Sequence, residues 1–366
     1  MDASIAAKVL LDVCGECKKD EKILIVTDPS SLEVGKAFFE AAKDYPNRNM
    51  IVIEETGLHG ANPNPQACDA MLNADIIFGC TKFSLFHAPA RRAAAEKGTR
   101  FVNMVDYQLR MFEEGGLFSD FYKLGDTCLK IAEIIDGKES CTITTARGTN
   151  ITCSIKDRKP NPQIGRSPKP GMASSPPDVE MATCAVEGTA NGVVYIDGSI
   201  PFPGLGLIKD AIKLTIKDSR VIAIEGDEQA EVLKKILADV DDPNAYIIGE
   251  IGLGLNPGCT LSGSMLEDEG CGGTIHFACG DNRSFGGHTA CKLHLDMVFR
   301  SPTMVVDGIT ILDFKTDRVA EETVAVAADR YRLQVETYAE ALTRIYEMPV
   351  KARYLYFFSL DRFVEV

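Results

Sequence analysis

The sequence has no long apolar run and no basic leader. No apolar stretch approaches the roughly 18 to 20 residues that a helix needs to span a bilayer, so we expect no membrane partner. Residues 1–22 lack a basic segment followed by a long apolar stretch and a small-residue cleavage site. We therefore expect a cytoplasmic protein without a signal peptide.

The sequence also lacks two features of nucleotide and nucleic-acid binding. No G-x-G-x-x-G follows any of its strand-like runs, which argues against a dinucleotide or P-loop function. Its net charge of -14 would repel a phosphate backbone, so nucleic acid is an unexpected partner. The 12 cysteines lie mostly in apolar runs, as is typical of reduced, buried thiols.

The spacing of apolar residues predicts an α/β protein. Buried strands separated by helices indicate a parallel sheet covered on both faces, in an N-terminal domain of residues 1–138. These strands are expected at 23–28, 49–55, 74–80 and 100–104. From Cys141 the apolar period changes to two, with a hairpin turn near 147–150, which predicts a β-rich α+β domain at 139–307. A short αβ tail, 308–366, follows.

Residues 250 to 296 carry the pattern of a metal site. His294 and Asp296 are two apart on an expected strand, so both side chains leave the same face. His276 projects opposite to its apolar neighbours, and Glu250 ends another strand. A single histidine is more often a hydrogen-bonded structural residue, but histidine grouped with carboxylates is a typical divalent-metal set.

Several longer runs resemble the thermophilic metallo-aminopeptidase family, which includes aminopeptidase T and AmpS. They are residues 179–200, 249–257, 266–287 and 292–308, and the resemblance extends over residues 1–307. It implies two divalent metal ions, zinc or cobalt with manganese as an alternative, and a homodimer. The ligands that it implies are Glu180, Glu250, His276, His294 and Asp296.

This resemblance implies that the chain removes N-terminal residues from short peptides or small amides. The metal ions would lower the pKa of a bridging water and polarise the scissile carbonyl. We expect Glu269 or Glu267 to take the proton, although an acidic turn in solvent would look the same. Phe285 stands where characterised members have a tyrosine, which puts assistance by a phenol in doubt.

Two other functions fit parts of the pattern. The family also resembles 2,5-dihydroxypyridine dioxygenase, a ring-opening enzyme with one iron. There the position that matches Glu250 is histidine, and the position that matches His276 is not. Because this chain has glutamate and histidine at these positions, the sequence favours the hydrolase. A non-catalytic metal-binding protein is the third alternative, because Phe285 replaces the tyrosine.

The tail, residues 308–366, resembles the end of a RecB-type nuclease domain, as in the AddA helicase-nuclease. The motif residues would be Asp313, Lys315, Gln334 and Tyr338. That nuclease family also needs an upstream aspartate, and the nearest candidate, Asp296, already belongs to the H-x-D pair. We therefore expect an incomplete nuclease fragment, folded as strand, helix and strand, without DNA cleavage of its own.

Overall fold

The chain folds into two compact units. The computed structural model describes residues 3–307, 310–315, 317–346, 350, 352–360 and 362–366. Unit 1 comprises residues 1–126 and 163–179, and unit 2 comprises residues 127–162 and 180–366.

This division differs from the boundaries expected at 138 and 307. The proline-rich segment 163–179 returns to unit 1 because it contributes a strand to the sheet of that unit. The tail joins unit 2 because its strands pair with those of unit 2. Residues 308 and 309, at the second expected boundary, lie outside the described residues.

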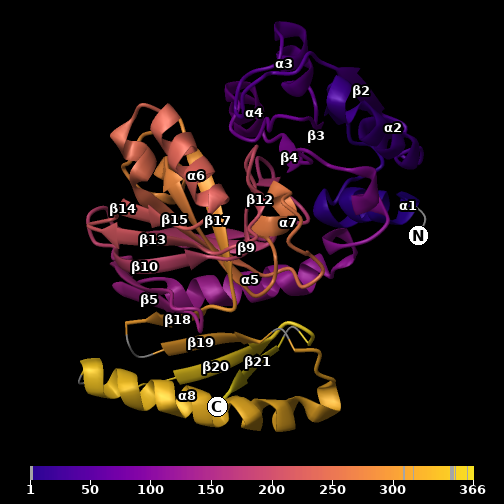
Figure 1. Ribbon diagram of the computed structural model, residues 1–366. Coiled ribbons are helices and arrows are strands. Elements are labelled where there is room, and N and C mark those ends of the chain that lie inside the picture. Colours follow the sequence, from indigo (N-terminus) through magenta and orange to yellow (C-terminus); the bar gives the residue numbers. More distant parts are fainter. Residues whose placement is uncertain (1–2, 308–309, 316, 347–349, 351, 361) are drawn as a thin grey trace. The chain divides into compact units, whose positions relative to one another are not determined.

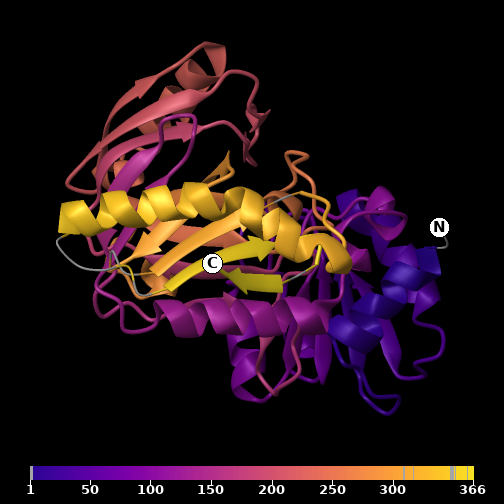
Figure 2. The same cartoon turned by 90° about the horizontal axis from the view of Figure 1, so that it is seen from below.

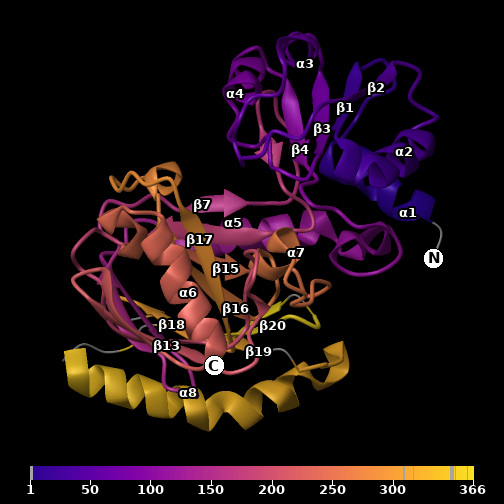
Figure 3. The same cartoon turned by 45° about the horizontal axis from the view of Figure 1, so that its top comes forward.

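Unit 1 is built on a parallel sheet with the strand order β2-β1-β3-β4-β8, and β1 to β4 lie side by side in Figure 3. The strands are β1 (Ile23–Thr27), β2 (Arg48–Val52), β3 (Ile76–Cys80), β4 (Arg100–Asn103) and β8 (Ala173–Ser174). The helices are α1 (Ala3–Lys8), α2 (Leu32–Ala41), α3 (Pro65–Met71) and α4 (Pro89–Glu96). Short helical turns are η1 (Val9–Cys14), η2 (Pro29–Ser31), η3 (Leu109–Phe112) and η4 (Gly116–Phe118).

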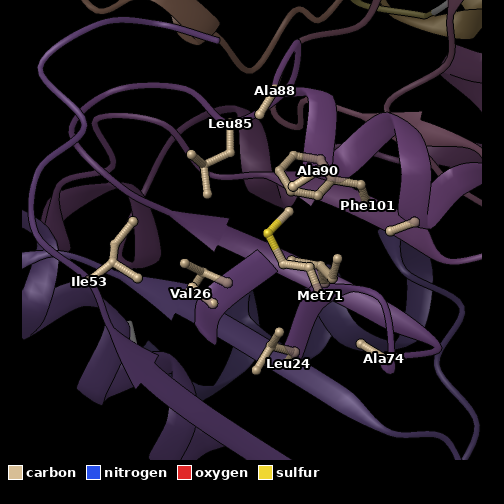
Figure 4. Packing of buried hydrophobic residues seen from close by; sticks show 12 residues of the cluster. Leu24, Val26, Ile53, Met71, Ala74, Leu85, Ala88, Ala90 and Phe101 are labelled. Atoms are coloured by element: carbon tan, nitrogen blue, oxygen red, sulfur yellow. The ribbon is translucent and has the colours of Figure 1, made fainter. Parts of the chain in front are cut away.

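Local sequence explains where two of these helices begin. Pro65 and Pro89 occupy the first positions of α3 and α4, where proline costs no hydrogen bond. The Asn64 side chain caps α3 by accepting a hydrogen bond from Ala67 N at 2.9 Å. In Figure 4 Met71 of α3 lies near Val26 and Phe101 of the sheet, within a fully apolar core. The predicted α/β class is therefore confirmed.

Unit 2 contains two large sheets among its described residues. The first has the strand order β14-β13-β10-β6-β5-β18-β19-β20-β21 and the second has the order β12-β11-β17-β16-β15-β9-β7. Strands of the first sheet are β5 (Ser140–Thr144), β6 (Asn150–Ser154), β10 (Asn191–Ile196), β13 (Ile212–Lys217), β14 (Arg220–Glu225), β18 (Thr303–Val306), β19 (Thr310–Lys315), β20 (Ala352–Phe357) and β21 (Arg362–Glu365). Several of them are labelled in Figure 1.

Strands of the second sheet are β7 (Asn161–Gln163), β9 (Glu180–Cys184), β11 (Ser199–Ile200), β12 (Gly206–Leu207), β15 (Ile248–Gly254), β16 (Thr274–Gly280) and β17 (His294–Arg300). Helices of unit 2 are α5 (Phe121–Ile135, which begins in unit 1), α6 (Glu228–Asp239), α7 (Met265–Glu269) and α8 (Val324–Tyr346). Short turns are η5 (Pro243–Tyr246), η6 (Arg283–Phe285) and η7 (Glu321–Thr323). None of the helices in the described part of the chain has both the length and the apolar character to cross a bilayer.

The tail continues the first sheet instead of forming a separate body. β19 pairs antiparallel with β18 and parallel with β20, and α8 makes the connection between the two parallel strands. Figure 2 shows α8 lying along these strands. The expected strand, helix and strand are present, and a further strand, β21, pairs with β20. Leu355 and Phe357 of β20 are fully buried in the apolar core beneath α8.

This packing predicts that the tail contributes to the stability of unit 2. Truncating the fully buried ring in Phe357→Ala should lower the free energy of unfolding by about 3–5 kcal/mol. Leu333→Ala is the matched control, because that side chain is 72% exposed and its loss should change stability by less than about 0.5 kcal/mol. Urea denaturation followed by circular dichroism measures both variants. Equal effects would show that the tail does not pack as described.

Candidate metal centre

Four neighbouring strands bring the predicted metal ligands onto one face of the second sheet. Strand β15 pairs antiparallel with β9 and β16, and β16 pairs antiparallel with β17. Residues directly opposite each other in such pairs project to the same side. The register places Gly254 opposite Glu180, Gly252 opposite His276, and Ala278 opposite Asp296. Alternation along each strand adds Glu250 and His294 to this face.

The other face of the same strands is apolar. Ile251, Ile275 and Phe277 alternate with the polar residues and are at most 1% exposed. The rings of Phe277 and Phe299 stack across β16 and β17 with centroids 5.5 Å apart. Burial of this apolar face stabilises the strand register, and the register in turn determines which polar side chains meet.

The structure brings all five predicted metal ligands together, in two groups that share Glu250. In the first group, His276 Nε2 lies 3.2 Å from Glu180 Oε2 and 3.7 Å from Glu250 Oε1. In the second group, His294 Nε2 lies 2.9 Å from Glu250 Oε2 and 3.4 Å from Asp296 Oδ1. Both groups offer nitrogen and carboxylate donors at a spacing suited to a metal ion.

The two groups differ in their access to solvent. Glu180, Glu250 and His276 are at most 6% exposed, whereas the His294 side chain is 34% exposed. A small molecule could therefore reach the centre from the His294 side. The His276 side is closed.

Asp296 links the two groups. Its Oδ1 atom lies 3.4 Å from His294 Nε2 and 3.9 Å from His276 Nε2. This buried oxygen accepts no hydrogen bond from the residues that the structure describes. Since a buried carboxylate oxygen is rarely left without a partner, its position between two imidazole nitrogens suits a metal ligand.

Gly252 makes room for His276. A Cβ atom at position 252 would lie 2.0 Å from His276 Nε2 and 2.2 Å from Cε1, so any side chain there would displace the ring. Sequence reasoning missed this role. The dense glycines at 249–258 were the available signal, since glycine permits close approach by a neighbouring group.

The carboxylates strongly favour positive charge on the histidines. Burial by itself lowers the pKa of His276, but the facing carboxylates of Glu180, Asp296 and Glu250 outweigh it and raise the pKa to about 9. Burial likewise lowers the pKa of His294, and Asp296 and Glu250 raise it well above the ordinary value. The pKa of Asp296 falls to about 2, because the charge of His294 outweighs the effect of burial.

The two predicted proton-transfer residues occupy different places. The Glu269 side chain lies beside Asp296, at the edge of the centre. Glu267 is 1% exposed, and its Oε2 accepts a hydrogen bond from Ser262 Oγ at 3.1 Å. Between the two, the geometry brings Glu269 to the predicted ligands.

Residues 281–289, here called the site loop, contact the open side of the centre. The His294 Nδ1 atom lies 2.7 Å from the carbonyl oxygen of Asp281, so Nδ1–H can donate to it. The ring of Phe285 stacks on the His294 ring, with centroids 5.7 Å apart and planes at 18°. The phenylalanine singled out in the sequence therefore packs against a predicted ligand.

The nuclease-like motif of the tail forms a separate cluster. Lys315 Nζ lies 3.0 Å from Asp313 Oδ2 and 3.2 Å from Gln334 Oε1, and Gln334 donates to Tyr338 Oη at 2.8 Å. Burial raises the pKa of Asp313. The four motif residues thus bind mainly one another, and Asp296 belongs to the other sheet.

The contact between Gly252 and His276 predicts a coupled effect on stability. Gly252→Ala should lower the free energy of unfolding of the metal-free protein by about 1–3 kcal/mol, because the added methyl overlaps the His276 ring. In a His276→Ala background the same change should cost far less. Urea denaturation of the four proteins in this double-mutant cycle measures the coupling. If Gly252→Ala lowered the free energy of unfolding equally with and without the His276 ring, the added methyl would clash with another group.

The raised pKa of His276 predicts a pH dependence of the metal-free fold. The protonated ring stabilises the folded state fully below its ordinary pKa of 6.5, and this contribution disappears as pH rises through about 9. The free energy of unfolding of chelator-treated protein should therefore fall between pH 6.5 and 9. His276→Gln should flatten this slope. An unchanged slope in that variant would assign the effect to another group.

Comparison with known proteins adds two solved structures of similar fold. The structure of 2,5-dihydroxypyridine dioxygenase from Pseudomonas putida KT2440 matches with a TM-score of 0.71 and 19% identity, over 83% of this chain and 93% of that chain. AmpT from Thermus thermophilus matches with a TM-score of 0.62 and 14% identity, over 83% and 94%. The expected likeness to aminopeptidase T thus holds at the level of fold.

Sequence comparison separates the body of the chain from the tail. The 2,5-dihydroxypyridine 5,6-dioxygenase of Pseudomonas putida is 24% identical over 270 residues, covering 70% of this chain and 74% of that protein. One component of the ATP-dependent helicase/nuclease of Clostridium botulinum is 42% identical over 60 residues. That match covers 16% of this chain and only 4% of the helicase/nuclease component, so it says nothing of the activity of that whole protein.

The expectation of an enzyme is confirmed, but the main expectation of a metallo-aminopeptidase is wrong. The preference for it over the dioxygenase rested on Glu250 and His276, and both are donors that zinc, cobalt and iron sites share, so these positions do not separate the two families. The match over most of the chain decides between them. The family model described as NicX, 2,5-dihydroxypyridine 5,6-dioxygenase, matches residues 8–315, and the chain belongs to that family.

Proposed function

We propose that this protein opens the ring of a small dihydroxylated nitrogen heteroaromatic compound, of the 2,5-dihydroxypyridine class, with dioxygen and one non-haem iron. Two findings support the proposal. The chain belongs to the NicX family, whose description names this reaction. The buried Oδ1 of Asp296 faces the Nε2 atoms of both His276 and His294. Histidine and carboxylate are the donor types of many iron-dependent oxygenases.

The chemistry of the donor set fits a divalent cation. Three carboxylates, Glu180, Glu250 and Asp296, are at most 8% exposed and lie against only two imidazoles. Buried charge is costly unless an opposite charge lies close by, and a divalent ion would provide it. Zinc or cobalt, and a second ion at the group containing Glu180, were the expectation from sequence. We propose iron because of the family, and because imidazole and carboxylate donors accept iron as readily as zinc or cobalt.

The residues of the centre would have different roles in the reaction. Glu250, His294 and Asp296, which form one of the two groups, would hold the iron, which would supply the redox chemistry with dioxygen. Glu250 contacts both histidines and would fix their orientation. The partly exposed side of His294 would admit the planar ring, whereas the closed His276 side would exclude water.

Glu269 is our proposed proton-transfer residue. Its side chain lies beside Asp296 and is half-buried, so it can reach both the centre and the solvent. A carboxylate at this place would accept the proton of a substrate hydroxyl. Glu267 is the weaker candidate because it already accepts a hydrogen bond from Ser262.

The proposal predicts oxygen uptake that depends on iron. Protein reconstituted with Fe(II) under anaerobic conditions should consume 2,5-dihydroxypyridine and dioxygen in equal amounts when air is admitted. His294→Ala and Asp296→Ala should lower kcat/KM at least about 100-fold, because each removes a metal donor. An oxygen electrode and the loss of the substrate's absorbance measure the reaction.

His288→Ala is the matched control, because this histidine is exposed and belongs to neither ligand group. Its activity should stay within about twofold of the unaltered protein. Release of p-nitroaniline from aminoacyl anilides without any oxygen uptake would contradict the proposal. The expected homodimer stays a prediction, and light scattering of the purified protein tests it.

A further inference from the structure

We propose that Arg158 and Glu187 form a clamp that positions the site loop and, through it, the His294 ring. The inference rests on the proposed metal centre, but the principal measurement below needs neither metal nor substrate. Neither residue touches His294 directly. Both act through the backbone and side chains of residues 281–289.

Arg158 ties the segment after β6 to the site loop. Its side chain is 9% exposed, and Nη2 pairs with the Glu187 carboxylate. Its Nη1 donates a hydrogen bond to the carbonyl oxygen of Gly286, within the site loop. Such charge-assisted hydrogen bonds from a largely buried guanidinium are among the stronger polar contacts of a protein.

Glu187 holds the loop at two further points. Its Oε1 accepts hydrogen bonds from Asn282 Nδ2 at 3.0 Å and from His288 N at 2.6 Å. Burial by itself raises the pKa of Glu187, but the hydrogen bond from His288, the Asn282 amide and the Arg158 charge together lower it. The carboxylate therefore remains ionised and keeps both ends of the loop in place.

The loop has little freedom of its own. Asn282 is fully buried, and its Oδ1 accepts a hydrogen bond from Thr289 N at 2.8 Å, which closes the loop across its base. A Cβ atom at Gly287 would lie 2.1 Å from Asn282 Cγ, so the backbone passes directly over this side chain. The clamp formed by Arg158 and Glu187 thus acts on a loop whose conformation is already fixed by its own contacts.

This compact loop presents two groups to His294. The Asp281 carbonyl faces Nδ1 at 2.7 Å, and the Phe285 ring covers one face of the imidazole. The Cys184 thiol also donates to the Phe285 carbonyl at 3.2 Å, and Cys184 lies directly opposite Glu250 in the sheet.

With Nδ1–H donating to the carbonyl, the Nε2 atom points toward Glu250 and Asp296. Groups that orient a histidine in this way typically change metal affinity about 10- to 100-fold when they are removed. Arg158 and Glu187 are therefore assigned as positioning residues for His294.

The test uses the full chain with 13C-labelled histidine, of which the sequence has five residues. Phe285→Leu removes the ring that stacks on His294 and so identifies its signal in the carbon–proton spectrum of the metal-free protein. Arg158→Met should move the His294 signal toward its position in Phe285→Leu. Glu187→Gln should move it in the same direction by less, because the amide oxygen can still accept hydrogen bonds.

Cobalt(II) serves as the metal probe. Its dissociation constant should rise about 10- to 100-fold in Arg158→Met and less in Arg158→Lys, which keeps the charge near Glu187. Arg147→Met is the matched control, because it removes an arginine–aspartate pair with Asp197 elsewhere in unit 2. The control should leave both the His294 signal and the cobalt affinity unchanged.

The outcomes separate this inference from the proposed reaction. An unmoved His294 signal in Arg158→Met, with an unmoved His276 signal showing that unit 2 is intact, would overturn the clamp. If that variant does not fold, the same reading applies to Arg158→Lys. A moved signal in a protein that shows no oxygen uptake would support the clamp and contradict the proposed reaction.

Discussion

The strand register across β9, β15, β16 and β17 is the constraint on which the candidate centre depends. A shift of one residue in any of these pairs would turn the polar side chains to the apolar face and the apolar ones to the centre. The register is maintained by the buried face, where Phe277 and Phe299 stack. Burial of the apolar face of the sheet thus determines how the polar side chains on the opposite face are arranged.

The arrangement of these side chains costs free energy, and the same cost favours the binding of a cation. Three buried carboxylates repel one another, and the two histidines relieve this repulsion only when they carry protons. A divalent ion would replace those two protons with the same charge, concentrated at one point among the carboxylates. The glycine at 252 belongs to the same arrangement, because the imidazole of His276 occupies the volume of the missing side chain.

Alternation along single strands was enough to predict the pairing of His294 with Asp296 and the inward direction of His276. The proximity of Glu180 to Glu250 depends on the pairing of β9 with β15, which lie far apart in the chain, so local pattern could not supply it. Resemblance to a family supplied these ligands but gave the wrong chemistry, since Glu250 and His276 are donors common to hydrolases and oxygenases. Local pattern also could not show that segment 163–179 returns to the first sheet, because its strand β8 pairs with β4, far away in the chain.

The continuation of the first sheet into the tail changes where that sheet ends. Strand β18 would otherwise present a row of unpaired backbone groups, and β19 covers them along its full length. The open edge moves to β21, a short strand that begins with an arginine and ends with a glutamate. Short, charged edges resist pairing with other chains, so the new edge is less open to edge-to-edge contact than β18 would be, while none of the tail residues that the structure describes belongs to the candidate centre.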